Sequence, residues 1–124
     1  MPARPLAFDP ARANLLNAYK AEFLEASLAS GLSPYTAGIR KRALEAFIRW
    51  ADERGLARPQ DVTRPILQRY QRHLFHARKS DGAPLAFSTQ ATLLNPVRAF
   101  FKWLTVENHL LYNPAADLEV PRVP

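Results

Sequence analysis

The sequence predicts an all-α protein, an orthogonal four-helix bundle with a possible short fifth helix. Apolar residues recur at steps of three and four in four separate stretches, which is the spacing of one helix face. Residues typical of helix starts and ends bound each stretch. No stretch alternates apolar and polar residues as a half-buried strand does. At 124 residues, 48% of them apolar, the chain has the length of one domain with a single core.

The first helix is expected to run to about Ser30, with either Asp9-Pro10 or Asn14 as its cap. Gly31 suits the position after its last turn. Residues 1–8 carry no apolar periodicity and predict a flexible N-terminal tail. The residues expected to form the buried stripe of this helix are Leu16, Tyr19, Phe23 and Ala26.

The second helix lies within 31–54, where Ser33 suits the N-cap and Pro34 the first helical position. Apolar side chains at steps of four and three predict its buried face: Tyr35, Ile39, Ala43, Phe47 and Trp50. Charges of alternating sign follow at steps of four along the outer face, so each is expected to pair with the next: Lys41, Glu45, Arg49 and Glu53.

The third helix is expected from a cap at Thr63 or Asp61 to about Arg78, followed by a loop over 79–87. Ser88 is expected to cap a fourth helix that ends near Glu107 and kinks at Pro96. The inward side chains are expected to be Ile66, Leu67, Tyr70, Leu74 and Phe75 on the third helix, and Leu93, Leu94, Val97, Phe100, Phe101 and Leu104 on the fourth. Residues 113–118 predict a short turn or helix, and residues 119–124 the start of a linker.

Basic and polar side chains gather at two places that suit an anion. Lys plus Arg number 17 against 11 for Asp plus Glu, giving a net charge of +6, and this excess suits a polyanionic partner. Thr36, Arg40 and Lys41 stand near the start of the second helix, where free N–H groups favour anions. On the fourth helix a basic ridge without a carboxylate is expected, beginning at Ala91 and formed by Asn95, Arg98 and Lys102. If the helix starts at Ser33 and Ser88 converge, they form an anion-binding surface about as wide as a DNA groove.

Several other functions find no support in the residues. The chain has no cysteine, and the acid nearest to His73 and His76 is Asp81, in a loop past the helix, so no metal site is assigned. No Gly-rich phosphate loop or catalytic set is evident, so no cofactor and no catalytic residue is assigned. Tyr19, Tyr35 and Tyr70 lie on apolar stripes and are interpreted as core. Without a membrane-length apolar run or a signal peptide, the expected location is cytoplasmic.

An alternative is a helical protein–protein interaction module whose positive charge is incidental. That interpretation predicts a contiguous exposed apolar patch and a partner whose binding is insensitive to salt.

A series of short motifs in a fixed order also points to a family. The chain resembles the N-terminal core-binding (SAM-like) domain of tyrosine recombinases, the phage-integrase and Xer-type family, over about residues 12–122. Each motif is weak alone, whereas the order and the distances are specific. The motifs are Gly31–Thr36, Ile39-Arg40, Leu44, Phe47, Trp50, Asp61-Val62-Thr63, Asp81-Gly82, Pro84-Leu85, Ser88-Thr89, Leu94, Val97–Leu104 and Asn113-Pro114-Ala115.

The resemblance implies a DNA-binding module, residues 9–118, that forms half of a clamp on double-stranded DNA during integration or recombination. It implies a C-terminal catalytic domain of the same parent chain, which would hold all the catalytic residues, so this fragment alone is not expected to be an enzyme. It also implies neighbouring protomers on the DNA, in contact through 9–30 and 113–120. The residues assigned to DNA binding are Thr36, Arg40, Lys41, Ser88, Thr89, Thr92, Asn95, Arg98 and Lys102.

Two positions depart from the family pattern. Thr92 and Leu93 stand where many relatives carry basic residues, which weakens the expectation of a base-reading contact there. Pro96 stands where relatives continue the helix without proline, and a bend is expected rather than a lost helix.

Overall fold

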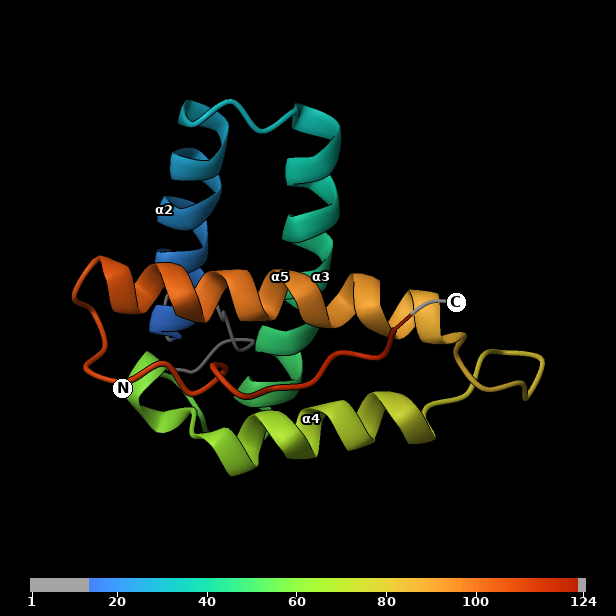
Figure 1. The fold of residues 1–124 in the computed structure, drawn as a ribbon. Helices are drawn as coiled ribbons and strands as arrows, with labels where there is room; N and C mark the ends of the chain where they lie inside the picture. The colour runs from blue at the N-terminus through green and yellow to red at the C-terminus, as the bar shows by residue number, and fades with distance from the viewer. Residues whose placement is uncertain (1–13, 123–124) are drawn as a thin grey trace, which may run out of the picture.

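The computed structural model describes residues 14–122, which form four α-helices and one short 3-10 helix. The elements are α2 (Leu15–Ala29), α3 (Pro34–Asp52), η1 (Pro59–Asp61), α4 (Arg64–His76) and α5 (Phe87–Val106). Helices α2 and α3 stand side by side, α5 crosses in front of both, and α4 lies along the bottom (Figure 1). Over the described residues the only β-pairing is an isolated bridge between Arg78 and Pro84, so the predicted all-α bundle is confirmed.

The cap of the first described helix is Asn14, the second of the two predicted candidates. Its Oδ1 accepts a hydrogen bond from the Leu16 N–H at 2.9 Å. Its Nδ2 donates to Asp52 Oδ1 and to the Leu56 carbonyl, both at 3.1 Å. Asn14 is 2% exposed, so this one side chain both caps α2 and ties it to the end of α3. The proposed tail and Asp9-Pro10 lie outside the described residues.

The predicted starts of α3 and α4 are confirmed. Ser33 Oγ accepts the Thr36 N–H at 3.1 Å, with Pro34 at the first helical position. Thr63 Oγ1 accepts the Ile66 N–H at 3.4 Å, so Thr63 rather than Asp61 is the cap of α4. Both helices therefore begin where a side-chain oxygen meets an otherwise free backbone donor.

The predicted start of α5 was wrong by two residues. The helix begins at Phe87, its N-cap is Ala86, and the cap makes no side-chain hydrogen bond. Ser88 therefore lies inside the first turn, where its carbonyl accepts a hydrogen bond from Thr92 Oγ1 at 2.9 Å. The buried Gln90 donates from Nε2 to the Leu85 carbonyl at 3.1 Å, which fixes the chain before the helix instead. The helix continues through Pro96, as expected, to Val106.

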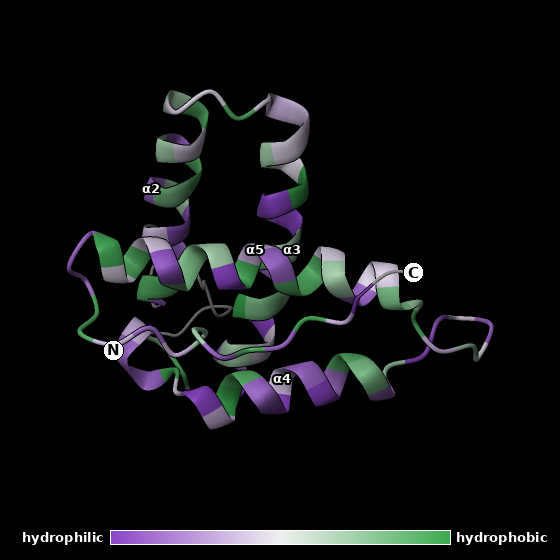
Figure 2. Cartoon of the chain, in the orientation of Figure 1, coloured by the Kyte–Doolittle hydropathy of each residue, from purple (hydrophilic) through white to green (hydrophobic). Residues whose placement is uncertain are grey.

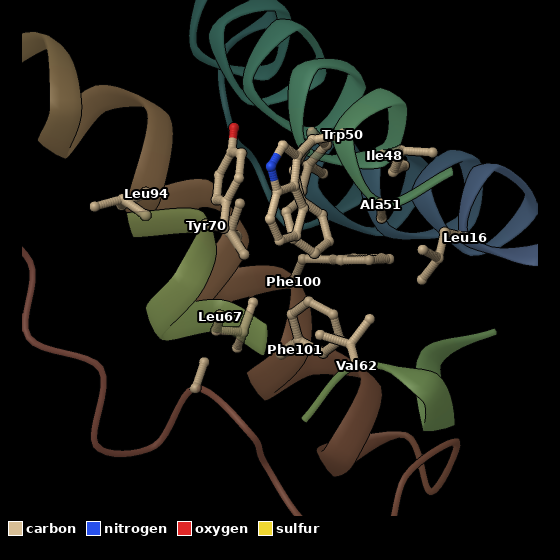
Figure 3. Close-up of a cluster of buried hydrophobic side chains, with 14 of the residues drawn as sticks. Leu16, Ile48, Trp50, Ala51, Val62, Leu67, Tyr70, Leu94, Phe100 and Phe101 are labelled. Carbon is tan, nitrogen blue, oxygen red and sulfur yellow. The ribbon is translucent and has the colours of Figure 1, made fainter. Parts of the chain in front are cut away.

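The core is a cluster of aromatic rings where α3, α4 and α5 meet (Figure 3). The ring of Phe47 lies 5.0 Å from Tyr70 and 5.9 Å from Phe101, both edge to face, and 6.1 Å from Trp50. Edge-to-face contacts add to the energy that these rings gain by leaving water. Among the described residues, Trp50 Nε1 is buried without a hydrogen-bond partner.

Two residues predicted to face inward do not. Tyr35 is 77% exposed, because the first turns of α3 project beyond α5. Phe75, near the end of α4, is 52% exposed, whereas Tyr19 is half-buried and packs against the core as predicted. The opposite error concerns Ala91, which was expected to begin the ridge and is 8% exposed. These sites lie at the edges of the apolar stripes, where a small rotation of the helix changes the exposure.

The predicted ladder of charges along α3 does not form. Glu45 pairs with Lys20 of α2 at 3.4 Å instead of with Lys41 or Arg49. Its side chain faces the neighbouring helix, because α2 packs against that side of α3. The pair joins two helices but contributes little to stability, since the Glu45 side chain is 40% exposed.

The segment after α5 returns along the molecule between α5 and α4 in the view of Figure 1. Asn113 Oδ1 accepts the Ala115 N–H at 2.9 Å, and this makes the predicted short element a turn rather than a helix. Leu118 is buried, and Gln71 Nε2 donates to the Glu119 carbonyl at 2.6 Å. The start of the expected linker therefore packs on α4. No helix among the described residues is long and apolar enough to cross a membrane.

Burial of Tyr70 gives the protein an expected weakness at alkaline pH. Burial raises the pKa of its hydroxyl to about 12, because the charged form loses its hydration. The pKa of Tyr70 is higher in the folded than in the unfolded protein. The free energy of unfolding therefore keeps its full value below about pH 10 and falls as the pH rises towards 12. At pH 11 the loss amounts to about 1.4 kcal/mol. Urea unfolding at pH 9 and pH 11 measures it, and Tyr70→Phe should remove this part of the pH dependence; an equal dependence in both proteins would contradict the assignment.

Candidate nucleic-acid interface

Three of the predicted DNA-binding residues form a continuous row on α5. Asn95, Arg98 and Lys102 are all exposed and follow one another at steps of three and four. They border a small open hollow of about 280 Å³, which the turn after Asn113 closes on its other side. Neither Arg98 nor Lys102 makes an ion pair with any residue that the structure describes. We call Asn95, Arg98 and Lys102 the α5 row.

The chemistry of the α5 row suits an oxyanion. A guanidinium and an ammonium supply several N–H donors, and the Asn95 amide supplies two more. Arginine can bind a phosphate through two parallel hydrogen bonds, while lysine acts as a point charge. Because no carboxylate among residues 14–122 pairs with these cations, an incoming anion would not have to displace one of them.

Arg40 lies in a different environment from the α5 row. Its Nη1 donates to Ser27 Oγ at 3.2 Å, and its guanidinium carbon lies 5.3 Å from the centre of the Phe23 ring. The side chain is half-buried beside an open hollow of about 510 Å³, to which α5 contributes Trp103 and Glu107. Arg40 therefore joins α3 to α2, and only part of its hydrogen-bonding capacity faces outward.

Lys41 and Thr36 also differ in what they can offer. Lys41 is exposed, and one turn later on the same side of α3 stands Glu45, which contacts Lys20 of α2. Lys41 thus points along the α2 side, away from α5. Thr36 is half-buried, and its Oγ1 already accepts a hydrogen bond from Ser33 Oγ at 3.0 Å.

Ser88, Thr89 and Thr92 are exposed in the first turns of α5. The hydroxyl proton of Thr92 is used within the helix, in the bond to the Ser88 carbonyl. Ser88 and Thr89 keep hydroxyls for which the structure gives no side-chain partner within residues 14–122. The first turn of α5 could therefore offer hydroxyls and backbone N–H groups together.

The two helix starts do not form the joint surface that the sequence suggested. Figure 1 shows α3 beginning at the top of the molecule and α5 beginning at its right-hand end. The helices cross partway along their length, and this crossing separates their N-termini. The idea that the helix starts at Ser33 and Ser88 lie side by side was wrong, because it depended on how two helices far apart in sequence cross. The α5 row is therefore the best-formed part of the predicted site.

Two contributors to these sites were not foreseen. Asn113 borders the α5 row but stands 11 residues after Lys102 by sequence number, where it was interpreted only as a turn former. Ser27 holds Arg40 from another helix, and a lone serine on a helix carries no local signal of that role.

No metal centre accompanies this surface in the part of the chain that is described. Residues 14–122 contain no group of three or more His, Asp or Glu side chains placed to hold a metal ion. His109 packs its ring against Tyr19 at 4.7 Å and against Trp103 at 5.7 Å between ring centres.

Comparison with known proteins identifies relatives over most of the chain. Tyrosine recombinase XerC 2 of Ralstonia nicotianae is 47% identical over 121 residues, covering 98% of this chain and 35% of the relative. Tyrosine recombinases XerC of Escherichia coli O157:H7 and Shigella flexneri are each 33% identical over 93 residues, covering 75% of this chain and 29% of the relative. No protein-family model and no solved structure matches the chain.

The chain spans only about a third of the length of these relatives. Identity of 47% across nearly the whole chain, in the order of motifs described above, nevertheless establishes common descent. The chain belongs to the tyrosine recombinase family.

Proposed function

We propose that this chain is the DNA-binding module of a site-specific tyrosine recombinase. In this proposal it forms half of a clamp on duplex DNA, and a catalytic domain of the same protein carries out strand exchange. The proposed contacts are those assigned from the sequence, with the α5 row at their centre. Neighbouring protomers on the DNA are the other proposed partners.

The observation that carries the proposal is the exposed, unpaired α5 row on a chain related to XerC recombinases. The net charge of +6 attracts a polyanion to the protein. Phosphate contacts supply most of the affinity of such surfaces, whereas base contacts supply specificity. The α5 row is suited to the first role, because its two cations are long and flexible.

The salt dependence of DNA affinity tests the proposal. If four to six phosphates are neutralised, log K should fall against log salt concentration with a slope of roughly −4 to −5. Fluorescence anisotropy of a labelled duplex titrated with the 124-residue chain measures this slope. Amide NMR shifts recorded in parallel should include residues of α5 around Asn95–Lys102. Affinity that does not respond to salt, or shifts that avoid α5, would contradict the proposal.

A second candidate, a protein-interaction module, is favoured by one exposed patch after α5. Leu111 and Tyr112 are 90% and 82% exposed. Leu111 and Tyr112 also line a mostly apolar hollow of about 450 Å³ against Val62 and the start of α4. An apolar patch of this kind suits a protein surface rather than a phosphate backbone. Asn113 borders both this hollow and the α5 row, so the two candidate surfaces adjoin.

A further inference from the structure

Helix α4 carries a row of basic side chains, two arginines and two histidines, that the proposed clamp does not use. Four side chains on its outer face are exposed: Arg69, Arg72, His73 and His76. They follow one another at steps of three, one and three, which places them on one side of the helix. We call these four residues the α4 face. Figure 2 shows how much of α4 is hydrophilic.

No carboxylate belongs to this helix or to the segment that follows it as far as Ser80. From Arg64 to Ser80 the chain contains five Arg or Lys residues, two His residues and no Asp or Glu. Within the described residues, Arg69 and Arg72 make no ion pair. Arg64 does pair, at 3.7 Å with Asp117, but it lies towards the edge of the helix that the returning segment covers.

Helix stability explains only part of this charge. Cations in a last turn are stabilised by the helix dipole, which accounts for His73 and His76. Arg78 likewise donates from Nη1 to the carbonyls of His76 and Ala77 at 3.2 and 3.0 Å. Arg69 lies in the first half of α4, where the dipole gives a cation no such advantage. The helix dipole therefore does not account for the charge of Arg69.

Two acidic residues lie at one edge of the α4 face. Asp117 and Glu119 line an open hollow of about 580 Å³ together with Arg72. Arg69, His73 and His76 do not line that hollow. Of the four residues, Arg72 alone thus shares a hollow with carboxylates of the described residues, and the other three, one arginine and two histidines, face solvent.

We infer that the α4 face is a second docking surface for the phosphate backbone of duplex DNA. From Arg69 to His76 the helix rises about 10 Å. Along one strand of a duplex, phosphates follow at about 3.4 Å of axial rise, so the α4 face spans roughly three of them. The positive charge of the α4 face and its length, which matches the phosphate spacing, favour DNA as the ligand. A small anion would need a concave site instead.

The α4 face points away from the start of α3, because α3 begins at the top of the molecule and α4 lies along its bottom (Figure 1). The buried side of α4, formed by Leu67, Tyr70 and Leu74, faces the core, so the α4 face is turned outward. A duplex held at the start of α3 would leave it accessible. The second DNA segment would therefore be another duplex or a distant part of the same one, and the chain could bridge the two. This bridging rests on the proposed function, whereas docking of DNA on α4 does not.

The test compares the 124-residue chain with Arg69→Gln/Arg72→Gln and with the charge-conserving Arg69→Lys/Arg72→Lys. Amide NMR shifts on adding a short duplex at low salt should appear on α4 in the unmodified chain and in the Lys variant. They should be lost on α4 and kept on α5 in the Gln variant. The salt slope of the Gln variant should be shallower by about two. Energy transfer between two differently labelled duplexes should fall at least fivefold in the same variant.

The outcomes separate the two proposals. Amide NMR shifts confined to α3 and α5, with equal salt slopes in all three proteins, would contradict the second docking surface. They would leave the proposed clamp unaffected. Shifts confined to α4 would support the second surface and overturn the clamp. No response of α4 to DNA, together with binding of an acidic protein there, would also overturn the inference.

Discussion

Replacing Phe47 with alanine should lower the free energy of unfolding by about 3–5 kcal/mol. Phe47 is 0% exposed and contacts the rings of Tyr70, Phe101 and Trp50 from three sides. Its loss removes apolar contacts and leaves a cavity where three helices meet. A domain of this size has a total stability of about 5–15 kcal/mol, so the variant should be close to unfolding at 37 °C. Urea denaturation monitored by circular dichroism measures the change.

The matched control for Phe47→Ala is Tyr35→Ala on the same helix. Tyr35 is 77% exposed, so its truncation should change the unfolding free energy by less than about 0.5 kcal/mol. An equal loss in the two variants would show that the ring cluster is not the centre of the core. The comparison also tests the correction to the predicted apolar stripe of α3.

Reversing both charges of the α5 row, as Arg98→Glu/Lys102→Glu, should weaken duplex binding by at least about a hundredfold at low salt. Each substitution removes a charge-assisted contact and adds repulsion from phosphate. Both side chains are exposed and unpaired among the described residues, so the fold should remain intact. Fluorescence anisotropy gives the affinity, and thermal unfolding checks the fold.

The control for the charge reversal is Arg49→Glu, an exposed arginine of α3 outside both proposed surfaces. It changes the net charge by the same amount per substitution, so it separates local contact from a general field effect. Comparable losses of affinity per substitution at Arg49 and in the α5 row would count against a defined interface on α5.

The sequence predicted the helices well because caps and apolar spacing are local. Ser33 and Thr63 satisfy backbone donors only three residues away, and both were identified. Ser88 was misplaced because its residue type suits a cap, whereas the actual N-cap, Ala86, makes no side-chain hydrogen bond and the chain before α5 is held by Gln90. Tyr35 has the right spacing for the core, but spacing does not show where a neighbouring helix stops covering it.

The candidate site was less predictable because it depends on how the helices cross. Arg98 and Lys102 share one helix, so their common face follows from the sequence alone. The partnership of Arg40 with Ser27 and Phe23, by contrast, requires knowledge of how α2 packs on α3. The cations of α4 were visible as a run without acids, but no motif marked them, and a basic face is often only a solvated one.

The upper ends of α2 and α3 project beyond the crossing of α5 (Figure 1). From Leu28 to Tyr35 no residue is buried, so little apolar contact opposes local opening there. Backbone amides in this helical hairpin should exchange with solvent much sooner than those around Phe47. Any ligand that touches the start of α3 would thus meet a poorly protected part of the protein, and its binding should be detectable as slower deuterium uptake at that tip.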